Sequence, residues 1–214
     1  FGVGSNYTFK KGTVNFSYNH INTERIYEDD STDVPANAFN KYSYATYGST
    51  TNFFEVYANL TPSENINFLI GADYQQITSD QTYRSVSGFG EFISPELTSD
   101  LANLSNLSGY FTANYAHQLI GVEIGGRLNN NSNYGVNYSY SINPYFKSKG
   151  FKVYGVLAKS YKNPSLYQVF SEYGNKELKP QEAITLDIGV EYQVLNSVKF
   201  AAVLFNRTTE NLFF

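Results

Sequence analysis

The sequence predicts an all-β chain that forms part of the wall of an antiparallel up-and-down transmembrane β-barrel. Three observations favour this fold class. Apolar and polar residues alternate with a period of two over runs on the order of 10 residues, which is about the length that a tilted strand needs to cross a bilayer. Short and long connections alternate between these runs. Tyr (20) and Phe (17) are abundant and charged residues make up only 16%, which suits strands better than helices.

Five runs show the alternation most clearly, and each opposes an apolar row to a polar one. In the last run, from Ala183 to Val194, the polar row contains Thr185, Asp187 and Glu191. The apolar rows are Phe54, Val56, Ala58 and Leu60; Ile66, Phe68, Ile70, Ala72 and Tyr74; Ile120, Val122, Ile124 and Leu128; Val136, Tyr138, Tyr140 and Ile142; and Ile184, Leu186, Ile188, Val190, Tyr192 and Val194.

The connections also follow a pattern. Outer-membrane barrels have short turns at one end and long loops at the other, whereas a soluble barrel or sandwich has no reason to do so. We therefore expect about ten strands in a single domain, 1–214, with almost no helix. Within 96–106, three leucines have helical spacing, and we favour a packed loop over a short surface helix. The short connections are 10–12, 61–65, 116–119, 147–150 and 195–197, the long ones are 24–40, 77–105 and 163–180, and 128–133 is intermediate.

Many aromatic residues lie near the ends of the expected strands. In a soluble sandwich they would form the core, but in a membrane barrel they form girdles at the two interfaces. Trp is absent, so Tyr and Phe would have to form these girdles alone. The residues that we expect there are Tyr7, Phe9, Tyr74, Tyr115, Tyr145, Tyr161 and Tyr192.

The composition excludes several other classes. The longest purely apolar run, 200–205, is far shorter than the roughly 20 residues of a membrane-spanning helix. The net charge of −4 gives no reason to expect a nucleic-acid partner. Cysteine is absent, the two histidines lie far apart, and no triad, HExxH, Walker or Cys/His pattern occurs. We therefore expect neither an enzyme nor a cofactor.

One segment is strongly acidic: Glu28, Asp29, Asp30 and Asp33 fall within six residues. Calcium prefers clustered carboxylate oxygens, but the spacing differs from that of an EF-hand loop. We therefore favour a solvated loop and keep a calcium site as the weaker alternative.

The most informative segment extends from residue 162 to the end. It reads K-N-P-S-L-Y-Q-V-F-S-E-Y-G-N-K-E-L-K-P-Q-E, followed by two alternating strands. It resembles the best-marked barrel segment of the TonB-dependent outer-membrane receptors, although Gln181 stands where Glu often follows the proline. We expect the prolines to rigidify the loop and the Gly-Asn pair to turn with positive φ. The motif residues are Asn163, Pro164, Leu166, Gly174, Asn175, Leu178, Pro180 and Glu182, with Tyr167, Lys179, Gly189, Tyr192, Phe205, Asn206 and Leu212 also matching.

This resemblance implies a segment of a 22-stranded barrel. It further implies a bacterial outer-membrane location, contact with lipid, and active import of a bulky, scarce nutrient with energy from TonB through a plug. Ferric siderophore is the first candidate cargo and cobalamin the second. Candidate ligand contacts are Tyr167, Phe170 and Tyr173, with packing against neighbouring loops as the alternative. We interpret Glu123, Arg127, Asp187 and Glu191 as solvated charges of the barrel interior, with contact to ligand or plug as the alternative.

Neither the plug nor the closing strands are expected within these residues. The chain opens on Phe-Gly-Val-Gly without a leader pattern, so we expect a processed chain or one that starts inside a longer protein. Two other functions remain open. A passive porin-like diffusion barrel would not depend on the inner-membrane energy source, and a surface adhesin or binding module would be soluble without detergent.

Overall fold

The computed structural model describes residues 1–214 except 36–37, 95–96, 172–173, 196 and 214. The described residues form one antiparallel sheet of 11 strands. Ten of them neighbour each other in chain order, and the short β5 pairs with β4, which confirms the up-and-down topology. The elements are β1 (Gly2–Phe9), β2 (Gly12–Asp29), β3 (Asn40–Ser63), β4 (Ile66–Ser87), β5 (Gly90–Ile93), β6 (Asn103–Ala116), β7 (Ile120–Asn131), β8 (Gly135–Ser148), β9 (Phe151–Lys162), α1 (Leu166–Phe170), β10 (Gln181–Leu195) and β11 (Val198–Glu210).

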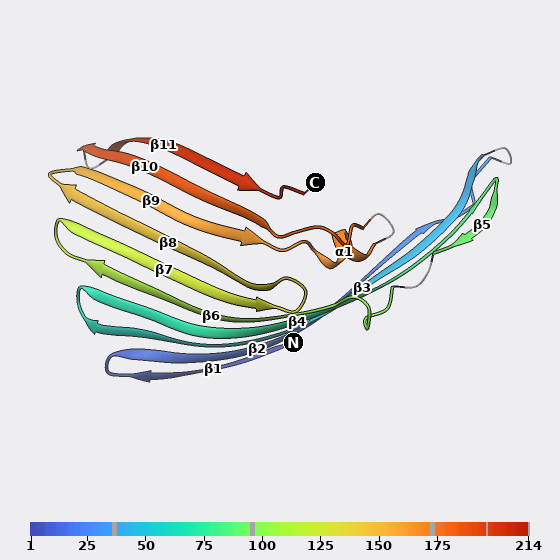
Figure 1. The fold of residues 1–214 in the computed structure, drawn as a ribbon, viewed down its shortest axis with the longest axis horizontal. Coiled ribbons are helices and arrows are strands. Elements are labelled where there is room, and N and C mark those ends of the chain that lie inside the picture. The colour runs from blue at the N-terminus through green and yellow to red at the C-terminus, as the bar shows by residue number, and fades with distance from the viewer. Residues whose placement is uncertain (36–37, 95–96, 172–173, 196, 214) are drawn as a thin grey trace.

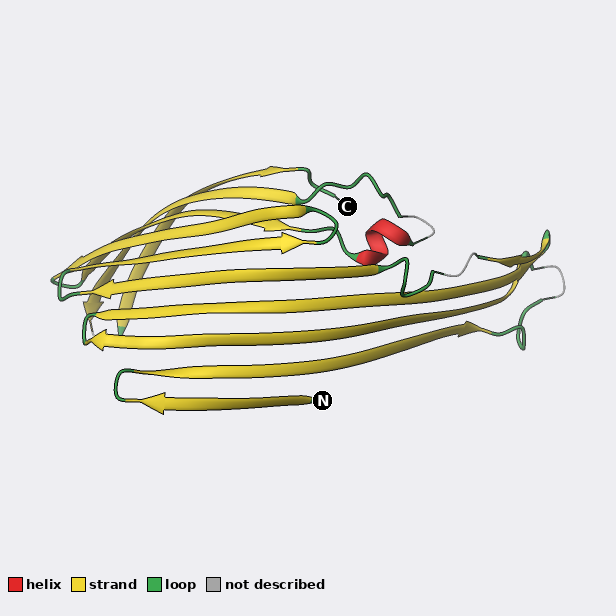
Figure 2. Cartoon of the chain, turned by 60° about the horizontal axis from the view of Figure 1, so that its bottom comes forward, coloured by secondary structure: helices red, strands yellow, loops and turns green. Residues whose placement is uncertain are grey.

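The sheet is curved, as Figures 1 and 2 show from two directions. Strands β1 and β11 form its two edges, and each is hydrogen-bonded to a single neighbour, β2 and β10 respectively. The short helix α1 lies at the end of the sheet that carries the long connections (Figure 2). No helix in the described part of the chain is long and apolar enough to cross a membrane.

The short turns gather at one end of the sheet and the longer connections at the other (Figure 1), as the sequence predicts. At the turn between β8 and β9, Lys149 (φ 47°) and Gly150 (φ 85°) are both left-handed, which matches the twist of a two-residue hairpin. Within 96–106, Leu97 forms an isolated bridge with Gln81 of β4, and β6 begins at Asn103. The described part of this segment is therefore a packed loop rather than a helix.

The two faces of the sheet differ in polarity. The apolar rows predicted from the sequence lie on the outer, convex face, where Ile188 is 55% exposed and its neighbours on the same row are similarly open. The opposite rows carry Asp, Asn, Ser and Tyr and line the concave inner face. Because a soluble sheet would bury its apolar row, this inverted arrangement is the one expected of a barrel wall in lipid.

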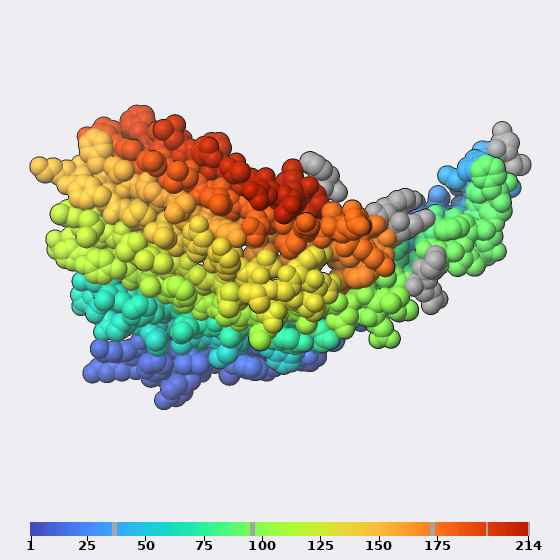
Figure 3. Space-filling view, viewed as in Figure 1, coloured from blue at the N-terminus to red at the C-terminus, as the bar shows by residue number. Residues whose placement is uncertain are grey.

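Strands β2, β3 and β4 contain 18, 24 and 22 residues, far more than a bilayer requires. The prediction that 24–40 and 77–105 are connections is therefore wrong in part, because Glu24–Asp29 continue β2 and Ile77–Ser87 continue β4. These three strands project beyond the rest of the sheet as an extension (Figure 3). Both faces of the extension are largely polar, so the alternation of apolar and polar residues that marks the other strands is absent there.

At the base of the extension, the outer face changes from polar to aromatic side chains. His20, Asn52 and Gln76 form a polar cross-strand row there. The next row towards the short turns is aromatic, where Tyr18 stacks on Phe54 with ring centroids 4.4 Å apart and Tyr74 lies beside Phe54. This row fits the predicted interface girdle.

The opposite interface is marked by a stacked pair on the outer face, Phe151 and Tyr192, whose ring centroids are 4.1 Å apart. The girdle prediction is wrong for Tyr145 and for Tyr161, which lines a cavity on the inner face. The register places Tyr145 opposite Gly121 and Tyr154 on the inner face, where its ring fills the space in which a Cβ of Gly121 would lie. The period of two that puts Tyr138, Tyr140 and Ile142 in the apolar row already places Tyr145 in the opposite row, and the girdle prediction overlooked this.

Candidate functional site

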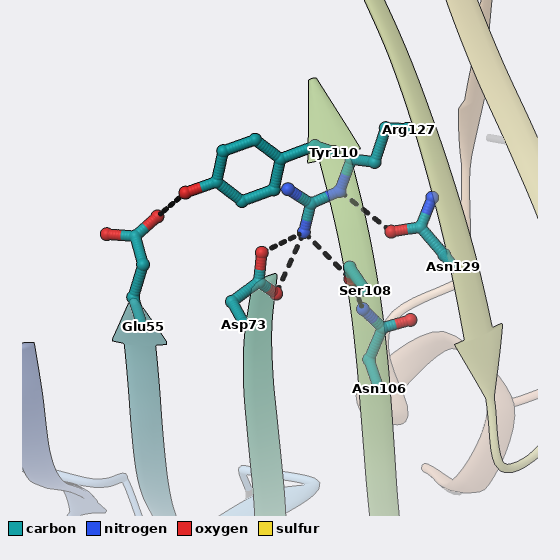
Figure 4. Close-up of polar contacts among 7 residues, drawn as sticks. All are labelled: Glu55, Asp73, Asn106, Ser108, Tyr110, Arg127 and Asn129. Carbon is teal, nitrogen blue, oxygen red and sulfur yellow. Dashed lines mark hydrogen bonds and ion pairs between the residues drawn. The ribbon is translucent and has the colours of Figure 1, made fainter. Parts of the chain in front are cut away.

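A hydrogen-bonded cluster lies on the inner face near the middle of the sheet (Figure 4). The register aligns Glu55 of β3, Asp73 of β4, Ser108 of β6 and Asn129 of β7 in one cross-strand row. Arg127 lies two residues before Asn129 and so points to the same face. The register alone therefore gathers two carboxylates and one guanidinium from separate strands.

Arg127 joins these strands. Its Nη2 lies 2.9 and 2.7 Å from the two carboxylate oxygens of Asp73 and 2.8 Å from Ser108 Oγ, and its Nε donates to Asn129 Oδ1 at 2.8 Å. The side chain of Asp73 is only 3% exposed, whereas that of Arg127 is 37% exposed. A buried carboxylate needs a counter-charge and additional hydrogen bonds, and Asp73 obtains the charge from Arg127. The interpretation of Arg127 as a merely solvated charge is therefore wrong.

Tyr110 completes the cluster. Its hydroxyl donates to Glu55 Oε1 at 2.7 Å, and the Arg127 guanidinium carbon lies 5.3 Å from the centre of its ring. The ring lies over Gly71, where a Cβ would meet the Tyr110 hydroxyl at 2.6 Å and Tyr57 Cβ at 2.7 Å. Glycine at position 71 is therefore what allows the tyrosine to lie flat against the wall.

The other predicted interior charges are also engaged in part. Glu191 forms an ion pair with Lys199 at 3.1 Å, and Glu123 accepts a hydrogen bond from Asn143 at 3.2 Å. The side-chain Oδ1 of Asp187 is buried without a hydrogen-bond partner. None of these carboxylates is as buried as that of Asp73, which the sequence alone did not single out.

A cavity of about 690 Å³ lies beside the cluster, between the inner face and the segment that follows β9. Its floor is formed by β4, β6 and β7, and its cover by the segment that leads into α1. Its lining residues are Ser49, Gln75, Ile77, Ser79, Leu104, Asn106, Arg127, Asn129, Asn131, Ser139, Ser160, Tyr161, Asn163, Pro164, Ser165, Leu166 and Tyr167. We call this the amide pocket.

A second cavity, of about 800 Å³, lies on the inner side of the extension. Arg25 and Asp29 supply charges at its wall, but most of its large side chains are tyrosines. Its lining residues are Arg25, Tyr27, Asp29, Asn40, Tyr42, Ser43, Ala45, Tyr47, Tyr83, Ser85, Val86 and Tyr167. We call this the tyrosine pocket. Tyr167 lines both pockets and so lies where they meet.

The helix that carries Tyr167 is fixed by its own sequence. Ser165 Oγ accepts from the backbone N–H of Gln168 at 3.2 Å, and Gln168 Oε1 accepts from the N–H of Ser165 at 3.0 Å, which is a complete capping box. Leu166 and Val169 are buried beneath the helix. Tyr167 points away from these anchors and is 55% exposed.

The remaining ligand candidates are placed differently. Phe170 is half-buried, with the Lys176 ammonium 5.9 Å from the centre of its ring, so it packs within its own loop. Tyr173 lies outside the described residues. Of the three aromatic candidates, only Tyr167 is described as lining the pockets.

The family-motif residues hold the loop together rather than gathering in one place. Asn163, Pro164 and Leu166 line the amide pocket. Further along, the Gln168 carbonyl accepts from the N–H of Asn175 at 2.8 Å, and the Pro180 carbonyl accepts from Asn211 Nδ2 at 3.2 Å. Glu182 forms an ion pair with Lys159 at 3.1 Å, and the N–H of Leu178 donates to the Asn175 carbonyl at 3.4 Å.

The predicted positive φ is not found at Asn175, since the described non-glycine residues with positive φ are Lys149 and Asn211. Gly174 has a different role. A Cβ there would come within 2.7 Å of the Val169 carbonyl, so the glycine permits the loop to fold back closely on α1.

The side chains of the acidic segment do not come together in one place. Glu28 and Asp29 are successive residues of β2 and point to opposite faces, and Asp29 lines the tyrosine pocket. The backbone N–H of Thr32 donates to Asp30, and this holds the pKa of the Asp30 carboxyl below its usual value. Asp33 lies in the loop beyond. Among the described residues, no three acidic, histidine or cysteine side chains gather as metal ligands would.

Sequence reasoning missed Asn131 and treated 128–133 as a connection. In the structure β7 continues to Asn131, and the inner row Arg127, Asn129, Asn131 forms the floor of the amide pocket. Extending the period of two from Arg127 through the run R-L-N-N-N would have placed Asn131 in the inner row. The contrast between the two rows is lost in this run, because the outer row also becomes polar at Asn130.

Three solved structures show the same fold. They are the copper transporter OprC (10% identity, TM-score 0.77, covering 99% of this chain and 38% of that one), a mutant of the ferric enterobactin receptor PfeA from Pseudomonas aeruginosa (17%, 0.70, 97% and 34%) and the siderophore receptor PirA from Acinetobacter baumannii (18%, 0.66, 96% and 34%). The chain thus spans about a third of the length of each. No curated protein matches the sequence.

A family model described as "TonB dependent receptor-like, beta-barrel" matches residues 1–214. The match covers every strand of the sheet and agrees with the inverted polarity of its two faces. The chain therefore belongs to the TonB-dependent receptor family, of whose β-barrel it forms a wall.

Proposed function

We propose that the protein to which this wall belongs is an outer-membrane active transporter that imports a bulky, scarce nutrient with energy from the TonB complex. The observation that carries the proposal is the pair of adjoining pockets on the inner face, which meet at Tyr167. Both lie at the long-loop end, and cavities of this size accommodate a substantial part of a bulky ligand. Membership of the TonB-dependent receptor family supports the source of energy.

The apolar outer face supports a location in the bacterial outer membrane, in contact with lipid. The aromatic rows near its two ends support the same location, because Tyr and Phe favour the interfaces. TonB would act through a plug domain, which is the partner that this family uses. The net charge of −4 gives no reason to propose a nucleic-acid partner.

A ferric siderophore is our first candidate cargo, and cobalamin is the second. The tyrosine pocket supports a ligand with flat, partly apolar groups, which aromatic side chains bind well. The three similar structures are named as a copper transporter, a ferric enterobactin receptor and a siderophore receptor, so the shared fold does not select among cargoes. Tyr167 is the contact that we favour, followed by Phe170 and Tyr173.

Uptake by the full-length protein tests the transport mechanism. Cells that express it would be given radiolabelled ferric enterobactin and, separately, labelled cobalamin, with and without a functional TonB. We expect uptake of one cargo, and its loss without TonB. Uptake that persists without TonB would instead support a passive diffusion barrel.

A variant pair tests the site. Tyr167→Ala should weaken cargo binding to the purified protein by about tenfold, because a large contact surface is lost. Tyr44→Ala is the matched control, since Tyr44 lies on the same extension but on its outer face and lines neither pocket. Equal effects of the two substitutions would argue against the pockets as the binding site.

A further inference from the structure

The floor of the amide pocket has unused hydrogen-bonding capacity. Asn129 and Asn131 are each only 2% exposed, and the Nδ2 of each has no hydrogen-bond partner. Asn106 and Asn163 line the same pocket, and the Oδ1 of each is buried without a partner. An unpaired buried polar group is costly, so four in the lining of one cavity require an explanation.

The orientation of the two buried donors is fixed by their other atoms. Asn129 Oδ1 accepts from Arg127 Nε at 2.8 Å, and Asn131 Oδ1 accepts from the backbone N–H groups of Asn133 and Tyr134 at 3.0 and 3.2 Å. Turning either amide over would bring its NH₂ against these donors. The Nδ2 groups are therefore the free ones.

Asn106 has the opposite orientation. Its Nδ2 donates to Ser108 Oγ at 2.7 Å, which leaves its Oδ1 as an acceptor. Together with Asn163 Oδ1, the lining thus contributes two spare donors and two spare acceptors. Ser139, Ser160 and other serine hydroxyls of the wall can serve as either.

The pocket carries no free charge. Arg127 is the one charged residue among those that line it, and Asp73 already neutralises that guanidinium. An anionic group would lack a free cation, and a cationic group would lack a free carboxylate. Tyr161 and Tyr167 add two aromatic rings to the lining.

We propose that the amide pocket binds a neutral, hydroxyl-rich group, such as a sugar ring of the transported ligand. Each hydroxyl both donates and accepts, so a ring of them satisfies spare donors and acceptors alike. The apolar face of such a ring can stack on a tyrosine. The assignment of the bound group as part of a cargo rests on the proposed import function, whereas its binding to the wall does not.

Titration calorimetry on the detergent-purified full-length protein tests this site. The probes are a panel of neutral oligosaccharides of glucose, galactose, mannose and xylose, together with an oligogalacturonate of equal length as the charged counterpart. We expect at least one neutral probe to bind and the charged probe to bind about tenfold more weakly or not at all. Absence of binding across the neutral panel would overturn the proposal and leave water as the occupant.

Two variants and one control locate the binding. Asn129→Leu should weaken the bound probe about tenfold, and Ser139→Ala should weaken it several-fold without touching the buried floor. Asn143→Ala is the control, because Asn143 lies on the same inner face with an unpaired buried Oδ1 but outside this pocket. If Asn129→Leu fails to fold, the affinity of Ser139→Ala for the probe still tests whether the amide pocket is the binding site. Equal affinity in Ser139→Ala and Asn143→Ala would refute the assignment.

The two proposals fail in different ways. If sugar binds but no cargo enters cells in a TonB-dependent manner, the import function fails and the site stands. If cargo enters in that manner and Asn129→Leu and Ser139→Ala change neither uptake nor sugar binding, the site fails and the import function stands.

Discussion

At the scale of single residues, the inner wall is organised by one buried carboxylate. Asp73 on β4 is nearly inaccessible to solvent, and its counter-charge comes from Arg127 on β7, which is two strands away in the sheet. Their ion pair therefore crosses β6 and connects strands that do not pair directly. Arg127 also fixes the amide of Asn129 in the floor of the amide pocket, so the ion pair helps to shape the candidate site.

Removing the guanidinium should be costly. Arg127→Leu leaves the Asp73 carboxylate buried and unpaired, and we expect a loss of about 2 to 3 kcal/mol in the free energy of unfolding, moderated by the partial exposure of Arg127. Equilibrium unfolding of the bilayer-inserted, full-length barrel in guanidinium chloride measures this loss of stability. Lys199→Leu breaks a more exposed pair with Glu191 and should cost under about 1 kcal/mol. Similar losses in both variants would contradict a special role for Asp73.

A second residue-scale prediction concerns Gly71. A methyl group there would collide with the Tyr110 ring and Tyr57, whereas a Cβ at Gly109 meets no atom within 4 Å. Gly71→Ala should therefore destabilise the barrel by about 1 to 3 kcal/mol, and Gly109→Ala should be nearly neutral. Thermal unfolding of the two variants, followed by the mobility shift of the folded barrel in gels, compares them directly. A Gly109→Ala variant as unstable as Gly71→Ala would show that contact with Tyr110 is not the cause.

At the scale of elements, period-two alternation predicted the strands wherever one face is apolar. The row from Ile184 to Val194 and the short turns were therefore found correctly. The extension of β2–β4 and the end of β7 were not, because their outer rows are polar and the contrast between faces vanishes. The amide pocket was missed for a related reason: it depends on the register between strands, which places Asn106 opposite Asn131. No single strand carries that information.

The polar outer face of the extension predicts where the membrane ends. Thr82 and Ile70 lie on the same face of β4, on either side of the row that contains Gln76. Thr82→Cys should react with a membrane-impermeant maleimide on intact cells, because it lies beyond the apolar band. Ile70→Cys should stay unlabelled until the membrane is dissolved. Labelling yields from whole cells measure both, and rapid labelling of Ile70→Cys would place the band elsewhere.

At the scale of the whole molecule, the sheet is stable only in surroundings that accept its outer face. Its apolar rows are exposed, its polar rows line the concave side, and the two edge strands keep unpaired backbone groups along one side each. In lipid these edges need further strands, since an unpaired peptide group costs several kcal/mol there. The fold, the polarity and the edges thus lead to the same conclusion, a wall that is complete only within a closed barrel.

The inverted polarity makes opposite faces respond differently to the same charge. Ile188 lies in the middle of β10 on the outer face, and Ser141 lies in the middle of β8 on the inner face. Ile188→Arg should lower the free energy of unfolding of the full-length barrel in lipid vesicles by about 2 to 4 kcal/mol, because a guanidinium would enter the hydrocarbon. Ser141→Arg should change it little, because its side chain reaches the polar interior. In detergent micelles, where water approaches the outer face more easily, we expect the difference between the two variants to shrink. Equal destabilisation by both substitutions in vesicles would mean that the outer face is not in contact with lipid.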